Sequence, residues 1–103
     1  MSIVAAFAVP HPPLIIPAVG HGREEGIRAT VEAYQEVARR IERLAPQTIV
    51  LSSPHATCYR DYVHVSPGTG ARGDFLQFGA PDAAYEADYD SAFVSALDAA
   101  AQA

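Results

Sequence analysis

The stretch AVPHPPLIIP, residues 8–17, ends an apolar run and places a histidine among prolines. The run before it, residues 3–9 (IVAAFAV), is short and continuous, which is typical of a buried strand in a parallel sheet. Because proline fixes φ and lacks an N–H, Pro10 and the prolines that follow it exclude both a helix and an interior strand. The sequence therefore predicts a strand followed by a stiff loop that carries His11.

A second stretch of the chain repeats this arrangement. Residues 48–53 (TIVLSS) form another apolar segment, and Pro54 and His55 follow it directly. Between the two segments, apolar side chains recur every three or four positions over residues 23–44, which predicts one long amphipathic helix. Strand, helix and strand together predict a right-handed βαβ unit with parallel strands.

The remaining sequence predicts one more strand and one more helix. Residues 62–66 alternate between apolar and polar side chains, as in a strand, and a glycine-rich turn and loop follow over residues 67–81. An apolar stripe over residues 85–101 predicts a C-terminal helix, with Asp82 as its cap. We therefore expect an α/β fold, a three-layer-type βαβ unit with a small, mostly parallel sheet, in a single domain over residues 1–103.

The composition of the chain excludes several classes of function. Twelve acidic residues against seven basic ones leave a formal net charge of -5, and all seven basic residues are arginine. The absence of lysine excludes Schiff-base catalysis and a P-loop lysine. The acidic balance argues against nucleic acid or a membrane surface as the main partner. A single cysteine and no apolar run of about 20 residues make the cytoplasm the expected location.

The two histidines follow the carboxyl ends of the two predicted parallel strands. Adjacent strands lie about 4.8 Å apart, so imidazoles at one edge of a sheet can converge on one metal ion. The prolines beside them reduce the conformational entropy that metal binding would remove. His11 and His55 are therefore the predicted metal ligands. Two alternatives stay open: a metal-free acid and base pair, and ordinary hydrogen-bonded loop histidines.

Three motifs, VPHPPLIIP, TIVLSSPHA and GDFLQFGAP, together resemble the class III extradiol ring-cleavage dioxygenases of the LigB-like superfamily. Within it they are most similar to the branch found alone or fused in AmmeMemoRadiSam-system proteins. The resemblance implies the catalytic subunit of an extradiol aromatic ring-opening dioxygenase, with non-haem Fe(II) held by two histidines and a carboxylate. It also implies a catechol-type substrate and O₂ as partners, with His11 and His55 as the two histidine ligands.

The resemblance covers the N-terminal part of the family's fold. In the family, the carboxylate ligand and the acid/base histidine lie in a C-terminal portion. We therefore expect the 103-residue chain alone to lack the third ligand, to be inactive, and to self-associate or be completed by such a portion. Within the chain, Asp61, Asp74 and Glu86 are the candidates for a third ligand, and Asp74 is the preferred one, with a solvated or turn-capping aspartate as the alternative. A second hypothesis is a non-enzymatic, Memo-like metal-binding or interaction module that holds Zn or Cu.

Overall fold

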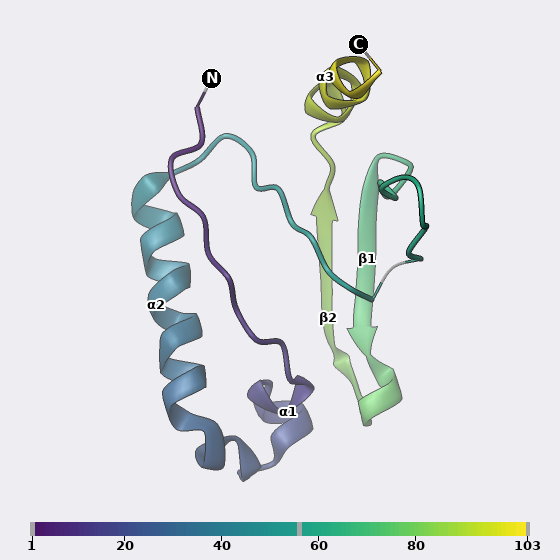
Figure 1. Ribbon diagram of the computed structural model, residues 1–103. Coiled ribbons are helices and arrows are strands. Elements are labelled where there is room, and N and C mark those ends of the chain that lie inside the picture. The colour runs from purple at the N-terminus through teal and green to yellow at the C-terminus, as the bar shows by residue number, and fades with distance from the viewer. Residues whose placement is uncertain (1, 56, 103) are drawn as a thin grey trace. The chain divides into compact units, whose positions relative to one another are not determined.

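The computed structural model describes residues 2–55 and 57–102 and has an α/β composition (Figure 1). Contacts divide the chain into two compact units, Met1–Gln47 with Gly73–Tyr85, and Thr48–Arg72 with Glu86–Ala103. None of the helices in the described ranges is long and apolar enough to cross a membrane. The elements in chain order are η1 (Pro13–Ile15), α1 (Pro17–Gly20), η2 (Arg23–Ile27), α2 (Arg28–Leu44), β1 (Gly70–Phe75), η3 (Leu76–Phe78), β2 (Ala80–Asp88) and α3 (Ser91–Ala101).

The long helix predicted over residues 23–44 is confirmed as η2 followed by α2. Most of the apolar side chains that suggested it are half-buried, namely Ile27, Val31, Tyr34, Val37 and Ile41, whereas Ala38 and Leu44 are exposed. The helix ends at Leu44, and Ala45, which follows it, adopts a left-handed conformation with φ 45°. The amide of Ala45 donates to the carbonyl oxygens of Ile41 (3.0 Å) and Glu42 (3.2 Å), so two of the last carbonyls of α2 are satisfied.

The polar side of α2 carries a cluster of ion pairs around one carboxylate. Glu36 accepts hydrogen bonds of 3.0 Å from the Nε atoms of both Arg39 and Arg40, and Arg43 lies 3.5 Å away. The bonds from Arg40 and Arg39 lower the pKa of Glu36 below its usual value. All four side chains are at least 40% exposed, so solvent screens these pairs and they contribute little to stability.

The sheet differs from the predicted one. In the described residues it has two strands, β1 and β2, which run antiparallel as a hairpin (Figure 1). The turn between them is η3, closed by a bond from the Gly79 amide to the Leu76 carbonyl oxygen (2.9 Å). Gly70 lets the strands approach closely, since a Cβ there would lie 2.9 Å from the Ala87 carbonyl oxygen. The hairpin thus occupies much of the region predicted as a loop, residues 67–81.

The three predicted strands at residues 3–9, 48–53 and 62–66 are not strands in the structure. Their apolar side chains are exposed: Ile3 is 90%, Leu51 86% and Val63 88% exposed. A strand forms only when a neighbouring strand pairs with its backbone, and within the described ranges β1 and β2 pair only with each other. The predicted parallel βαβ sheet is therefore not formed by these residues.

The C-terminal helix is confirmed, but it begins at Ser91 rather than near residue 85. Asp90, and not Asp82, caps it: the Asp90 carboxylate accepts a bond from the Phe93 amide (3.0 Å) and another from the Thr48 hydroxyl. The bonds from Thr48 and Phe93 lower the pKa of Asp90 below its usual value. The helix starts later than predicted because β2 extends to Asp88.

Candidate metal centre

His11 lies at the surface of the first unit, in the loop that leads into η1. Pro12 after it adopts an extended conformation, with φ -70° and ψ 133°. A residue that precedes proline is itself restricted to extended conformations, so Pro12 also limits the backbone of His11. The local sequence therefore presents the imidazole from a loop with few conformational alternatives.

A folded block follows His11 and closes the loop on its C-terminal side. The carbonyl oxygen of Pro12 accepts a bond from the Ile15 amide (3.2 Å), which forms η1. The Arg23 side chain donates to the carbonyl oxygens of Gly20 (3.1 Å) and Val19 (3.3 Å) and so ties η2 to the end of α1. Val19 is only 7% exposed and belongs to the small core of the chain. The chain after His11 is thus fixed by its own local hydrogen bonds.

Helix α2 contacts the loop on the other side of His11. The Tyr34 hydroxyl donates a hydrogen bond to the carbonyl oxygen of Pro10, the residue directly before His11. The sequence pattern identified Tyr34 only as a member of the apolar stripe of the helix. The phenol hydroxyl of Tyr34 indicates that this residue also needs a hydrogen-bond partner, and no other feature of the sequence indicates the contact.

His55 lies at the surface of the second unit, directly after Pro54. Its backbone amide donates to the hydroxyl oxygen of Ser53 (3.3 Å), a local bond that bends the chain. Three aromatic side chains follow in the same unit. Tyr59 stacks on Tyr62 with ring centroids 4.6 Å apart, and the ring of His64 lies 6.3 Å from that of Tyr59. His64 therefore lies in an irregular segment and not in the predicted strand, and its ring is near that of Tyr59.

Asp74, the candidate third ligand, caps the turn of the hairpin. Its carboxylate accepts a bond from the Leu76 amide (2.9 Å), which is the alternative role that the sequence left open. Across residues 2–55 and 57–102, the structure brings together no group of three or more His, Cys, Asp or Glu side chains that could hold a metal ion. His11 and His55 are nitrogen donors of the type that iron, zinc and copper accept. By donor type alone, they match the two nitrogen ligands of a two-histidine, one-carboxylate site.

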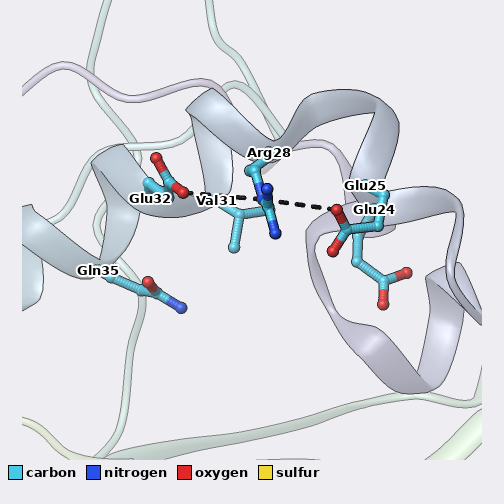
Figure 2. Close-up of a pocket in the computed structure, with 6 residues that line it drawn as sticks. All are labelled: Glu24, Glu25, Arg28, Val31, Glu32 and Gln35. Atoms are coloured by element: carbon cyan, nitrogen blue, oxygen red, sulfur yellow. Dashed lines mark ion pairs between the residues drawn. The ribbon is translucent and has the colours of Figure 1, made fainter.

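A surface pocket of about 240 Å³ lies elsewhere in the first unit, along η2 and the start of α2 (Figure 2). Arg28 reaches across it and pairs with Glu25 (3.5 Å) and Glu32 (3.8 Å). These side chains are about two-thirds exposed, so the pocket is a solvated ion-pair network. The lining residues are Glu24, Glu25, Arg28, Val31, Glu32 and Gln35.

Comparison with known proteins gives the family of the chain. Residues 5–101 match the family described as the catalytic LigB subunit of aromatic ring-opening dioxygenase. The chain is also similar to protein CA_C1420 of Clostridium acetobutylicum, with 35% identity over 86 residues. That alignment covers 84% of this chain and 18% of the relative, so the chain spans less than a fifth of the relative's length. No solved structure matches it significantly. Since the family match includes nearly the whole chain, the protein belongs to the LigB family of aromatic ring-opening dioxygenase catalytic subunits.

Proposed function

We propose that the chain forms part of an extradiol dioxygenase catalytic subunit in which His11 and His55 are two ligands of a non-haem Fe(II). The observation that carries this proposal is the family match over residues 5–101, which includes both Pro-His motifs. Both histidines are exposed. The Tyr34 hydroxyl donates to the Pro10 carbonyl oxygen in the first motif, and the His55 amide donates to the Ser53 hydroxyl oxygen in the second. Surface imidazoles on restrained loops are suited to binding a metal ion.

The chemistry of such a site explains the type of substrate. A set of two histidines and one carboxylate would hold Fe(II) and would leave it accessible to a chelating catechol-type diol and to O₂. When bound, the iron supplies the redox centre at which these two reactants meet. In this chain, His11 and His55 would bind the ion, and the loops that carry them would determine its position. The proposal assigns the carboxylate to another part of the whole protein.

The parallel βαβ arrangement also belongs to this proposal. Residues 3–9 and 48–53 are apolar and exposed, and α2 between them has the length of a crossover connection. In the whole protein we propose that these two segments pair as neighbouring parallel strands. That pairing would bring His11 and His55 to the same edge of the sheet, where ligands of open α/β sheets bind.

Metal analysis of anaerobically prepared protein tests the proposed centre. We expect Fe(II) to bind with one ion per chain, and His11→Ala and His55→Ala each to weaken binding at least about tenfold, because each removes a ligand. His64→Ala is the matched control, since it removes an exposed histidine outside both Pro-His motifs. Elemental analysis and calorimetric titration measure the ion and its affinity.

The outcomes of this experiment separate the hypotheses. Iron binding, together with oxygen uptake when the whole protein is given a catechol, supports the dioxygenase. Tight Zn²⁺ or Cu²⁺ binding without oxygen uptake favours a metal-binding module of the Memo-like kind. If neither alanine variant differs from the parent protein in metal content, His11 and His55 are not ligands and the proposed centre is wrong.

A further inference from the structure

We propose that Tyr34 is a positioning residue for His11, because its hydroxyl fixes the peptide that joins Pro10 to His11. The inference rests on the proposed function, in which His11 is a metal ligand. It adds a residue that lies 24 positions away from the Pro-His loop, on helix α2. Tyr34 contacts the backbone of the loop, so it would act through His11 and not on the metal.

The prolines around His11 leave one main freedom in its backbone. The ring of Pro10 fixes φ at residue 10, and Pro12 restricts ψ of His11 to extended values. The two remaining torsions, ψ of Pro10 and φ of His11, together rotate the peptide plane between these residues. The Pro10 carbonyl oxygen belongs to that peptide plane, and it is the atom to which Tyr34 donates. The hydrogen bond therefore restrains the rotation that the prolines leave free.

The hydrogen bond also links the N-terminal side of the loop to a regular element. Residues 2–9 lie in no helix or strand, whereas the chain after His11 is fixed by η1, α1 and η2. Tyr34 sits near the middle of the 17-residue helix α2 and is half-buried in its apolar stripe. A side chain anchored in this way has few rotamers to lose, so its hydroxyl is a firm attachment point.

Removal of this single oxygen should weaken metal binding without removing a ligand. A hydrogen bond of this kind makes a modest net contribution, and the prolines still restrain the loop. We therefore expect Tyr34→Phe to lower the affinity for Fe(II) by about three- to tenfold. The matched control is Tyr89→Phe, which loses a tyrosine hydroxyl that lies 2.7 Å from the Ser66 hydroxyl in the second unit. The control should leave the affinity unchanged.

A second readout needs no metal. In the apo protein, ¹⁵N relaxation of the His11 amide should give an order parameter near that of α2, about 0.85. In Tyr34→Phe the order parameter of the same amide should fall to about 0.6 or below, whereas in the control variant it should equal that of the parent protein. A purely structural role of Tyr34 would lower the melting temperature but would change neither the order parameter of His11 nor the affinity for Fe(II).

The two readouts distinguish failure of this inference from failure of the proposed function. If the parent binds no Fe(II), the metal centre is wrong, and the apo order parameters still decide the role of Tyr34. If Tyr34→Phe matches the parent in both readouts, the inference is overturned. If circular dichroism shows that Tyr34→Phe loses its helices, the order parameter of the His11 amide in the parent protein is the test instead. A value below about 0.6 overturns the inference, and a value near 0.85 supports it.

Discussion

Gly20 ends α1 in a space that has no room for a side chain. A Cβ at this position would lie 2.8 Å from the Leu14 carbonyl oxygen, and it would also meet the carboxylate of Glu24. Glu24 can rotate away, but the Leu14 carbonyl belongs to the backbone of the block that follows His11. We expect Gly20→Ala to lower the free energy of unfolding by about 1–3 kcal/mol, because the backbone must shift. Urea unfolding followed by circular dichroism measures this change.

Gly26 provides the matched control for that prediction. It lies in η2, six residues further along, and a Cβ there would meet nothing within 4 Å. Gly26→Ala should therefore be neutral or stabilise the chain by up to about 1 kcal/mol, since alanine restricts the unfolded chain more than glycine does. Equal destabilisation by the two substitutions would contradict the packing described around Gly20.

The residues of the candidate site show which features the sequence could predict. His11 and His55 lie in exposed loops after apolar segments, as the proline pattern indicated, because proline acts on the backbone locally. Their role as ligands stays a prediction. The bond from Tyr34 to Pro10 could not be predicted, since it joins residues 24 positions apart and depends on how the loop lies against α2. Asp74 had two possible roles, and the sequence alone could not choose between them.

At the scale of elements, a strained residue follows the C-terminus of α2. Ala45 has φ 45°, in the left-handed region where a Cβ is unfavourable and glycine is preferred. We expect Ala45→Gly to stabilise the chain by about 0.5–1 kcal/mol, because it relieves this strain and keeps the two capping bonds of the Ala45 amide. Thermal unfolding monitored at 222 nm measures the effect.

The same alanine-to-glycine substitution inside α2 should have the opposite effect on stability. Ala38 is exposed and lies in the middle of the helix, so Ala38→Gly should cost about 1 kcal/mol through the lower helix propensity of glycine. The pair of variants therefore tests the position at which the helix ends. Destabilisation by both substitutions would place Ala45 within the helix.

Helices were predicted better than strands because their determinants are local. The apolar stripe over residues 23–44 specifies a helix through contacts three and four positions apart. The hairpin was missed because β2 contains Pro81 and several alanines, which are uncommon in strands, and its stability depends on pairing with β1. Residues 3–9 and 48–53 were wrongly predicted as strands. Their apolar composition favours a strand, but a strand also needs a neighbouring strand to pair with.

At the scale of the whole molecule, much of the apolar surface is uncovered. Half of the residues are hydrophobic, yet in the described ranges the buried hydrophobic residues are Val19 and Ala80. Large apolar side chains gather in the predicted strands, where the segment 48–53 is exposed over several consecutive residues. Exposed apolar surface of this extent indicates a site of association. We therefore expect these segments to take part in association of the chain.

Association of the chain in solution should consequently depend on Leu51, which is 86% exposed in the segment 48–53. We expect the parent to form dimers or larger species at tens of micromolar, and Leu51→Glu to shift it toward the monomer, because a carboxylate on this segment is costly to bury. Sedimentation velocity measures the distribution. Gln77→Glu adds the same charge at an exposed position of η3 and should leave association unchanged. If both variants dissociate to the same extent, net charge and not the apolar segment controls association. If the parent protein is already monomeric, residues 48–53 do not drive association of the chain.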